Sequence, residues 1–323
     1  MTSGTQPGAP AVEEFAACRP RMFGIAYRML GSADEAEDVV QDAYLRWDRA
    51  DRSVIEWPAA WLAKVVTHLC VNRLTSARAR RETYPGPWLP EPVLTGDEVF
   101  GPVESAERRD SVSTALLVLL ERLTPTERAV YVLREAFGYS HRDIAGVLDL
   151  GEANCRQLYR RAVRRVTADR TRAGEEAPAA RPAARCAPPS EERWGALVES
   201  FVAASREGDL ARLERLLAED VTWWSDGGGK VRAALQPVLG RDAVLRFLGG
   251  VLAKASGVSG TAGLELVVAE VNGAPALVAH AAGRFVAVGT FEAREGLITE
   301  VRMVMNPEKL TFAERQFAAM SHS

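Results

Sequence analysis

The segment "LTPTERAVYVLREAFGYSHRDIAGVLDLGEANCRQLYRRAVRRV", Leu123 to Val166, predicts a series of helices joined by tight turns. Thr124 and Ser140 are helix N-caps in this pattern, and Gly138 separates two of the helices. A short turn, "DLGE", precedes a last helix that is rich in arginine. Two short helices joined by a tight turn, the second carrying basic side chains, are typical of a helix-turn-helix that binds DNA.

The last helix of this segment has one apolar face and one basic face. At about 100° per residue, the apolar face consists of Cys155, Tyr159, Ala162 and Val166. From Gly151 to Arg172 the chain has seven arginines against two acidic residues, although the whole chain has a net charge of −3. A basic surface on an otherwise acidic chain indicates one anionic partner that binds at one place.

The positions on this basic face predict different contacts with DNA. Arginine and glutamine can hydrogen-bond guanine and adenine edges in two places at once, so we expect base contacts from Arg156, Gln157 and Arg160. Phosphate contacts set the position on DNA and the salt dependence of binding, and we expect them from Arg161, Arg164 and Arg165. A basic helix face that only contacts solvent is the alternative interpretation.

A second helical region, from about Glu13 to Arg81, carries an acidic surface beside a basic one. Its middle helix, "ADEAEDVVQDAYLRW", has an acidic outward face that repels DNA and suits a basic protein surface. The next helix opens at Pro58, and the residues near its end that are available to nucleic acid are Asn72, Arg73, Arg78, Arg80 and Arg81. A repressor has little use for both surfaces, whereas a protein that tethers a polymerase to DNA needs them.

The C-terminal part of the chain has a different pattern. A Pro/Ala-rich segment, Glu175 to Ser190, marks the clearest domain boundary. Two helical stretches follow, "ERWGALVESFVAASREGD" and "LARLERLLAED", and then alternating apolar runs separated by turns such as "VNGAPA". The runs that predict strands are "VTWW", "LELVVAEV", "PALVAHAA", "RFVAVGTFEA" and "LITEVRMVM". Helices followed by a mostly antiparallel sheet predict a small α+β domain.

Composition limits the remaining functional classes. The chain is 47% hydrophobic and 26% charged, as in ordinary globular proteins, and no apolar run approaches the roughly 18 residues that span a bilayer. The first residues lack the pattern of a secretory signal, so we expect a cytoplasmic protein with no membrane partner. The four cysteines and four histidines are scattered without metal-ligand spacing, which predicts reduced thiols, no metal and no cofactor.

Several stretches of the chain resemble a known protein family. "GSADEAEDVVQDAYLRW", "PAAWLAKVVTHLCVNRL" and the segment quoted first resemble regions two and four of extracytoplasmic-function (ECF) RNA polymerase sigma factors, over about residues 13–172. "YPGPWLPEP" from Tyr84, "DGGGK" from Asp226 and "NPEKL" from Asn306 resemble the three signatures of a subgroup, often called SigJ-type, that carries a SnoaL-like domain.

The resemblance implies a multidomain fold. Two all-α helical modules, sigma region 2 and sigma region 4 with its helix-turn-helix, precede an α+β, cone-shaped SnoaL-like domain. The expected boundaries are 10–82 for region 2, 83–103 for a proline-rich linker, 104–174 for region 4, 175–190 for a Pro/Ala linker and 191–315 for the SnoaL-like domain.

The resemblance also implies partners and roles. It implies an alternative sigma factor that binds core RNA polymerase, at its β and β′ subunits, and directs promoter-specific initiation. The residues that would dock on the clamp helices of the polymerase are Asp38, Gln41, Asp42 and Arg46. The loop 49–56 and the helix that follows, with Asn72, Arg73, Arg78 and Arg81, would handle the −10 element, and the helix after Gly151 would read the −35 element. Trp47 and Trp61 match buried faces, so we expect them to pack rather than to melt DNA.

In the resembling subgroup the C-terminal domain stands in for a separate anti-sigma factor. The prolines of "YPGPWLPEP" hold an extended shape at low entropic cost, which presents Trp88 and Leu89 as apolar anchors. We therefore expect the linker to dock on the SnoaL-like domain, with Glu91 as a charged partner of Lys230. The expected regulatory contacts are Trp88, Leu89, Pro90, Glu91, Asp226, Gly227, Gly228, Gly229, Lys230, Asn306, Pro307 and Lys309.

Two other interpretations compete with a sigma factor. An isomerase-like enzyme would need an acid or base and an oxyanion donor in a pocket, for which Asp220, Asp226 and His280 are candidates. The domain contains no tyrosine after Trp194, so the set is incomplete and we expect no enzyme. A one-component DNA-binding regulator, with an unknown small-molecule ligand in the cone, is the main alternative and leaves the acidic helix unexplained. We expect the free protein to be a monomer.

Overall fold

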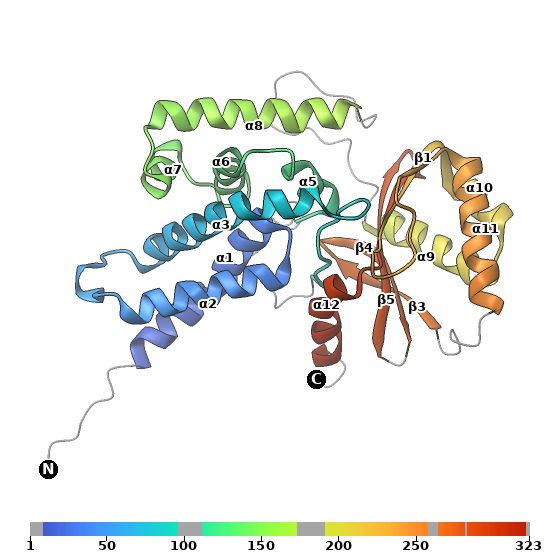
Figure 1. Cartoon of the computed structure of the whole chain (residues 1–323), viewed down its shortest axis with the longest axis horizontal. Helices are drawn as coiled ribbons and strands as arrows, with labels where there is room; N and C mark the ends of the chain where they lie inside the picture. Colours follow the sequence, from blue (N-terminus) through green and yellow to red (C-terminus); the bar gives the residue numbers. More distant parts are fainter. Residues whose placement is uncertain (1–8, 96–111, 173–190, 258–263, 282, 321–323) are drawn as a thin grey trace, which may run out of the picture. The chain divides into compact units, whose positions relative to one another are not determined.

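The structure is a computed structural model that describes residues 9–95, 112–172, 191–257, 264–281 and 283–320 (Figure 1). The chain divides into two compact units, which are considered separately. The first, called unit 1, comprises Met1–Arg80, Asp97–Val112 and Leu116–Glu176, and the second, called unit 2, comprises Arg81–Gly96, Ser113–Ala115 and Ala177–Ser323. The proline-rich linker therefore belongs to the same compact unit as the C-terminal α+β domain.

Unit 1 is helical throughout the residues that the structure describes. Its elements are α1 (Ala9–Leu30), α2 (Ala33–Arg49), a 3-10 turn (Arg52–Val54), α3 (Pro58–Glu82), α6 (Pro125–Glu135), α7 (His141–Leu148) and α8 (Glu152–Arg172), with α5 (Thr114–Leu120) at the border of the two units. None of the described helices is both long enough and apolar enough to cross a bilayer.

Local side-chain chemistry sets the helix ends in unit 1. Ser32 Oγ accepts a hydrogen bond from the Glu35 backbone N–H at 3.1 Å and so caps α2. Thr124 and Ser140 each form a capping box at the start of α6 and α7. Gly138, between these helices, has φ of +68°, a conformation that favours glycine. The caps and the break predicted from the sequence are confirmed.

Apolar side chains at helical spacing on α1 and α2 form the core of the N-terminal module. The buried members are Phe15, Met22, Ile25, Ala26, Met29, Ala36, Val39, Val40, Ala43 and Trp47. Tyr44 is only half-buried and meets the ring of Phe15 edge-on, with 5.0 Å between ring centroids. Trp47 packs against Trp61 at 5.7 Å, so both tryptophans pack as expected.

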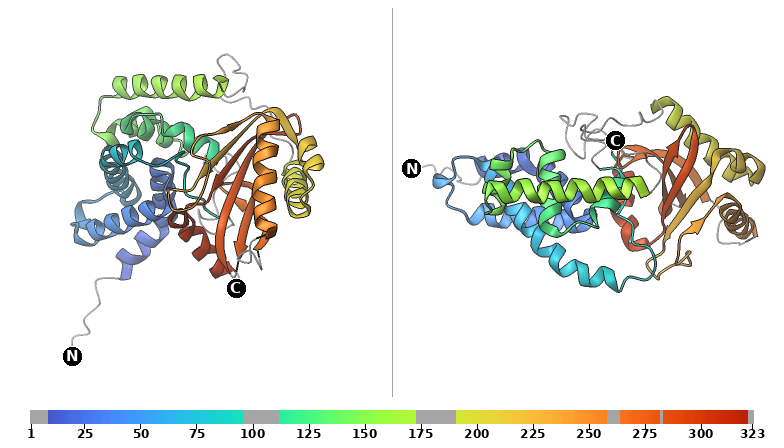
Figure 2. Two further views of the ribbon diagram at one scale, coloured as in Figure 1. Left: turned by 45° about the vertical axis from the view of Figure 1, so that its right-hand side comes forward. Right: turned by 90° about the horizontal axis from the view of Figure 1, so that it is seen from above.

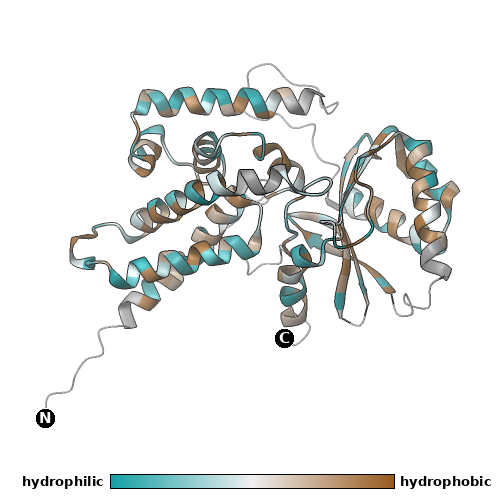
Figure 3. Ribbon diagram, in the orientation of Figure 1, coloured by the Kyte–Doolittle hydropathy of each residue, from teal (hydrophilic) through white to brown (hydrophobic). Residues whose placement is uncertain are grey.

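The helix-turn-helix consists of α7, the turn 149–151 and α8. Cys155, Ala162 and Val166 are buried, and half-buried Tyr159 donates its hydroxyl hydrogen to Glu135 Oε1 at 2.7 Å. The rest of α8 is predominantly hydrophilic (Figure 3). The amphipathic pattern read from the sequence is therefore the pattern by which α8 packs on its own module.

Unit 2 consists of a sheet with helices on both faces (Figures 1 and 2). Its elements are α9 (Glu191–Glu207), α10 (Leu210–Leu216), β1 (Leu217–Asp226), β2 (Val238–Leu239), α11 (Arg241–Gly257), β3 (Leu264–Val271), β4 (Ala274–Ala281), β5 (Arg284–Arg294), β6 (Leu297–Val304) and α12 (Pro307–Met320). The strand order is β2-β1-β6-β5-β4-β3, with β1 parallel to β6 and every other pair antiparallel. The predicted α+β class is confirmed.

Two details of unit 2 differ from the sequence expectation. The predicted helix "LARLERLLAED" ends at Leu216, because Leu217 and Ala218 are buried as the first residues of β1. Helix α11 was not predicted, since the pair Gly249–Gly250 interrupts its helical pattern. The Asn-Gly turn is confirmed, with φ of +54° at Asn272 and +75° at Gly273.

Helices α9, α10 and α11 cover one face of the sheet and form an apolar cluster with it. Its members include Phe201, Leu213, Trp223, Leu248, Phe291, Val301 and Met303. Helix α12 lies on the other face (Figure 1). The linker, which is itself part of unit 2, lies beside α12 and contacts its residues Lys309 and Gln316.

Candidate functional site

The linker Tyr84–Thr95 lies against the C-terminal α+β domain, and we call this contact the linker dock. At its far end the backbone N–H of Thr95 donates to Glu270 O at 3.1 Å, and Asn272 N–H donates to Val93 O at 2.9 Å. Leu94 exchanges hydrogen bonds with the Gln316 side-chain amide at 2.9 and 3.1 Å. Leu89, Pro90 and Pro92 to Thr95 are buried. The second half of the linker is therefore held as part of the folded domain.

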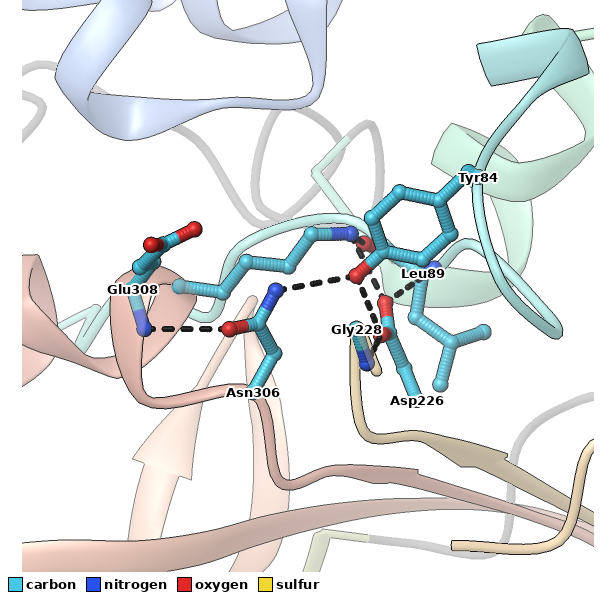
Figure 4. A network of polar contacts seen from close by, with 7 residues as sticks. Tyr84, Leu89, Asp226, Gly228, Asn306 and Glu308 are labelled. Carbon is cyan, nitrogen blue, oxygen red and sulfur yellow. Dashed lines mark hydrogen bonds and ion pairs between the residues drawn. The ribbon is translucent and has the colours of Figure 1, made fainter. Parts of the chain in front are cut away.

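Asp226, the last residue of β1, is the centre of the near end of the dock (Figure 4). Its carboxylate is fully buried and accepts hydrogen bonds from Tyr84 Oη at 2.5 Å, Leu89 N at 2.8 Å and Gly228 N at 3.1 Å. Lys309 Nζ lies 2.7 Å from the same carboxylate. One side chain thus caps its own turn and holds two residues of the linker.

Lys309, from the first turn of α12, supplies the positive charge of this network. It is 7% exposed, and its ammonium donates to Asp226 and to Leu89 O, the latter at 2.5 Å. The ammonium also lies 4.1 Å from the ring centroid of Trp88 and 4.8 Å from that of Tyr84. Burying a charge is costly unless it is paired and hydrogen-bonded, and here the linker supplies part of that compensation.

Tyr84 and Asn306 connect the linker to the start of α12. The Tyr84 hydroxyl donates to Asp226 and accepts a hydrogen bond from Asn306 Nδ2 at 2.9 Å. Asn306 Oδ1 in turn accepts from the Glu308 backbone N–H at 3.1 Å. Burial and the Asp226 carboxylate raise the pKa of Tyr84, which keeps its hydroxyl a neutral donor.

The glycines of "DGGGK" leave the space that these side chains occupy. Gly228 has φ of +57°, and a Cβ there would overlap the Asn306 side chain and lie 2.9 Å from the Tyr84 hydroxyl. A Cβ on Gly229, at φ of +69°, would lie 2.9 Å from Pro85 of the linker. The turn therefore needs glycine both for its backbone conformation and for the close approach of the linker.

The structure changes one pairing that the sequence suggested and adds one residue. Lys230 pairs with Glu308 at 2.9 Å, so the prediction of Glu91 as its partner is wrong. Lys230 and Glu308 are close because Asp226 holds the glycine turn against the first turn of α12. Tyr84 was not predicted as a contact, although it opens the quoted linker motif. Its position beside two prolines was the available signal.

The candidate acid and base residues do not form one site. Asp220 is exposed and pairs with Arg294 at 3.1 Å, six positions before Asp226 on β1 and so roughly 20 Å away along an extended strand. His280 packs against the rings of Phe285 and Phe317. Asp226 is committed to the linker dock.

In unit 1, α8 presents most of the residues expected to contact DNA. Arg156, Gln157, Arg160, Arg161 and Arg164 are exposed, and Arg156 also pairs with Glu152 one turn earlier. Arg165 is also exposed, and it forms an ion pair with the buried carboxylate of Glu127 on α6. Arg165 thus helps to join α6 to α8, and its phosphate contact stays a prediction.

Of the α2 residues expected to dock on the polymerase, Asp38, Gln41 and Arg46 are exposed, whereas Asp42 is half-buried. Arg73 from α3, expected to contact the −10 element, reaches across to this helix.

Arg73 lies 2.9 Å from Asp42 and 3.5 Å from Asp38, and it donates to Glu35 O at 3.2 Å. It therefore joins α2 to α3 rather than standing free toward DNA. Asn72 is exposed, and the side chains of Arg78 and Arg81 lie outside the described residues.

Three family models match the chain in the order of its modules. Residues 15–80 match sigma-70 region 2, residues 113–166 match sigma-70 region 4, and residues 198–301 match a SnoaL-like domain. The ECF RNA polymerase sigma factor SigJ of Mycobacterium tuberculosis is 37% identical over 307 residues, which cover 93% of each chain. The probable ECF RNA polymerase sigma factor SigI of the same species is 32% identical, over 79% of this chain and 90% of that one.

The fold agrees with these sequence matches. The crystal structure of the M. tuberculosis sigma factor SigJ superposes with a TM-score of 0.69 at 33% identity, and the match covers 93% of this chain and 98% of that one. The matches to regions 2 and 4, the match to a SnoaL-like domain and the near full-length similarity to SigJ all indicate the same family. The chain belongs to the ECF RNA polymerase sigma factors, in a form that also carries a SnoaL-like domain.

Proposed function

We propose that this sigma factor binds core RNA polymerase through the acidic face of α2 and reads a promoter with α3 and α8. Exposed Asp38 and half-buried Asp42, beside Gln41 and Arg46, suit a basic surface of the β and β′ subunits. The exposed polar residues at the start of α8 suit base edges of a −35 element. The loop 49–56 and Asn72 suit the −10 element.

The tryptophans near that loop differ in exposure, which supports different roles for them. Trp57 is 69% exposed, whereas Trp47 is buried. An exposed aromatic ring beside the −10 region can stack on an unpaired base. Trp57 therefore contacts the melted strand in our proposal, while Trp47 and Trp61 hold the module together.

We further propose that the SnoaL-like domain regulates initiation in cis through the linker dock. The single observation that carries this proposal is the buried Asp226–Lys309 pair that holds Tyr84 and Leu89 of the linker. A linker that is docked on the domain cannot at the same time bind along the polymerase. Docking and initiation therefore require two different states of the linker, one docked and one released. A tethered domain has an effective concentration of about millimolar, so even a moderate contact stays populated.

The cone favours a scaffold over a catalyst or a sensor. Its interior is the packed apolar cluster described above, and the candidate acids and base are apart. We therefore propose a cytoplasmic, non-enzymatic regulatory domain on a chain that is monomeric when free. The one-component regulator is not favoured, because it leaves the region 2 module without a role.

Transcription from purified components tests the proposal. The full chain, added to core RNA polymerase with a promoter library, is expected to give promoter-specific transcripts. Asp226→Ala, which weakens the dock from outside the linker, is expected to raise transcript output severalfold. Trp88→Ala, which removes a linker anchor, is expected to change the output as well.

Asp220→Ala is the matched control, because it removes an exposed carboxylate from the same strand. DNA binding without initiation by the wild-type chain would favour the one-component regulator. Equal output from the wild-type chain and both dock variants would refute regulation through the linker dock.

A further inference from the structure

The two DNA-facing modules of unit 1 contact each other at the helix-turn-helix turn. Lys64 and His68 lie one turn apart on α3 and both reach the end of α7. Lys64 Nζ lies 2.5 Å from Asp149 Oδ1 and donates to Gly146 O at 3.1 Å. His68 Nε2 lies 2.7 Å from Val147 O and 3.5 Å from Asp149 Oδ2. We call this group of contacts the latch.

Asp149 is placed for this contact by the fold of the turn. It ends α7 in the left-handed conformation, with φ of +54°, and Lys64 contacts both its carboxylate and the Gly146 carbonyl, one of the last carbonyl groups of the helix. Those carbonyls carry the negative end of the helix dipole, which favours a cation such as the Lys64 ammonium. The hydrogen bond from Lys64 lowers the pKa of Asp149, so the carboxylate is charged at neutral pH.

A second, buried contact lies deeper between the same modules. Arg128 of α6 is 3% exposed and donates to Met29 O, at the end of α1, at 2.7 Å. Burial lowers the pKa of Arg128 to about 9, which shows how poorly its guanidinium is solvated. Among the described residues its Nε has no hydrogen-bond partner, but its guanidinium also pairs with Glu121 of its own module at 2.7 Å. Of these contacts, separating the modules would break the hydrogen bond to Met29.

A groove of about 640 Å³ runs beside the latch. Its lining includes Arg21, Trp61, Lys64, Phe137, Tyr139 and Arg142. The Arg21 guanidinium lies 5.2 Å from the ring centroid of Tyr139, which adds a cation–π contact between α1 and the loop before α7. The groove borders the latch, so Lys64 lies at the edge of an open space rather than in a packed core.

We propose that the latch holds the free sigma factor in a closed state in which it cannot read both promoter elements. This inference rests on the proposed roles of α3 and α8. Elements named −10 and −35 lie about 25 base pairs apart, which is roughly 85 Å along DNA at ~3.4 Å per base pair. Helix α3 itself is only about 37 Å long at ~1.5 Å per residue, and in the closed state it touches the turn that begins α8. The modules must therefore separate before both elements are bound.

The latch is suited to opening, because it is exposed. The side chains of Lys64 and Asp149 are 40% and 65% exposed, and ion pairs of this kind change an equilibrium by at most about fivefold. A partner that binds only the open state, such as core polymerase together with a two-element promoter, can displace so weak a contact.

Zero-length carbodiimide crosslinking of the full chain tests the latch directly. The reagent activates the Asp149 carboxyl, and the Lys64 amine then forms an amide bond with it, so only groups in contact are joined. Lys230 and Glu308, 2.9 Å apart in unit 2, are the matched control pair with 55% and 70% exposure. We expect both crosslinks in the free chain and selective loss of the Lys64–Asp149 crosslink in the initiating complex.

Asp149→Asn provides the second measurement. Asparagine tolerates the left-handed conformation, so the turn is retained while the charge pair is lost. We expect the free variant to bind DNA carrying both elements about two- to fivefold more tightly than the wild-type chain, and DNA carrying one element equally well. Asp220→Asn, with the same 65% exposure in an ion pair, is expected to leave both affinities unchanged.

Two results would overturn the latch, and neither depends on the proposed promoter roles. One is the control crosslink forming in the free chain without the Lys64–Asp149 crosslink. The other is an undiminished Lys64–Asp149 crosslink in a complex that is producing transcripts. If the wild-type chain gave no promoter-specific transcript, the proposed function would fall, whereas the crosslink in the free chain would still report whether the latch exists.

Discussion

Two lysine–aspartate pairs in this molecule have nearly the same length and opposite surroundings. Lys309 and Asp226 in the linker dock are 2.7 Å apart, with side chains 8% and 0% exposed. Lys64 and Asp149 in the latch are 2.5 Å apart, with side chains 40% and 65% exposed. The first pair lies under two aromatic rings and accepts or donates further hydrogen bonds to the linker, whereas the second faces solvent.

This difference shows that burial, and not distance, sets what each pair can do. Removing one partner of a buried pair leaves an unpaired charge in a poorly solvated place and costs roughly 3–5 kcal/mol. An exposed pair is worth about 0.2–1 kcal/mol and is screened by salt. The dock is therefore built to hold a segment in place, and the latch is built to be displaced.

The largest expected effect comes from Asp226→Asn. The substitution leaves Lys309 buried without its carboxylate and removes an acceptor for Tyr84 and Leu89, so we expect the linker to leave the domain. Hydrogen exchange at the Thr95 backbone N–H, which is bonded to Glu270 rather than to Asp226, measures this release. Its protection should fall about a hundredfold or more, or to the level of unstructured chain.

A double variant separates the charge effect from a general loss of structure. Lys309→Met added to Asp226→Asn removes the unpaired cation, and part of the lost protection should return, since apolar replacement of a buried pair is often tolerated. Asp220→Asn is the exposed control and should leave the exchange unchanged. Full protection at Thr95 in the single Asp226→Asn variant would show that the buried pair does not hold the linker.

The next effect comes from Gly228→Ala compared with Gly296→Ala. Both glycines have positive φ, +57° and +82°, so alanine costs roughly 1–2 kcal/mol of backbone strain at either position. Only at Gly228 does the new Cβ also overlap Asn306 and approach Tyr84, while at Gly296 no atom of the described residues lies within 4 Å. We expect Gly228→Ala to destabilise unit 2 by about 1–3 kcal/mol more than Gly296→Ala, measured by denaturant unfolding. Equal losses would mean that the turn adapts without moving α12.

A smaller effect is expected from Tyr84→Phe. It removes the hydroxyl between Asp226 and Asn306 and should weaken the dock by about 1–2 kcal/mol. Because the pKa of Tyr84 is raised on folding, its contribution is complete below the ordinary tyrosine pKa of about 10 and is lost as the pH rises through the higher folded value. The linker of the wild-type chain should therefore loosen in strong alkali by a step that Tyr84→Phe lacks. Identical alkaline profiles would contradict this role.

The sequence alone predicts the parts of this fold that depend on local chemistry. The caps at Ser32, Thr124 and Ser140 and the Asn-Gly hairpin turn follow from neighbouring residues, and the amphipathic faces and the strands follow from periodicity. Helix α11 does not follow from the sequence, because its glycine pair interrupts the helical pattern. Its helix is stabilised by packing in the apolar cluster.

Contacts between residues distant in the sequence are harder to predict, because a surface arginine or lysine can pair either with a carboxylate of the same chain or with a nucleic acid. In the sequence, Arg165 and Arg73 belong to basic stretches that indicate DNA binding. In the fold, they form ion pairs with Glu127 and Asp42. The motifs of the linker dock pointed to each other, but the partner of Lys230 depended on how Asp226 places the glycine turn. The latch joins residues 85 positions apart and has no motif of its own.

The smallest expected effect, and the most direct comparison of the buried pair with the exposed pair, comes from a salt titration. Between about 0.05 and 0.5 M salt the Debye length falls from roughly 14 to 4 Å, which screens exposed charges and leaves buried pairs nearly untouched. The Lys64–Asp149 crosslink should therefore decrease up to a few fold across this range, whereas the exchange protection of Thr95 in the dock should stay constant. The Lys230–Glu308 crosslink, from an exposed pair in unit 2, should decrease in parallel with the first, because screening acts on exposure and not on the identity of the module. If the latch crosslink stayed constant while this control decreased, the contact would be held by the Arg128 interface beneath it, and opening would have to begin there.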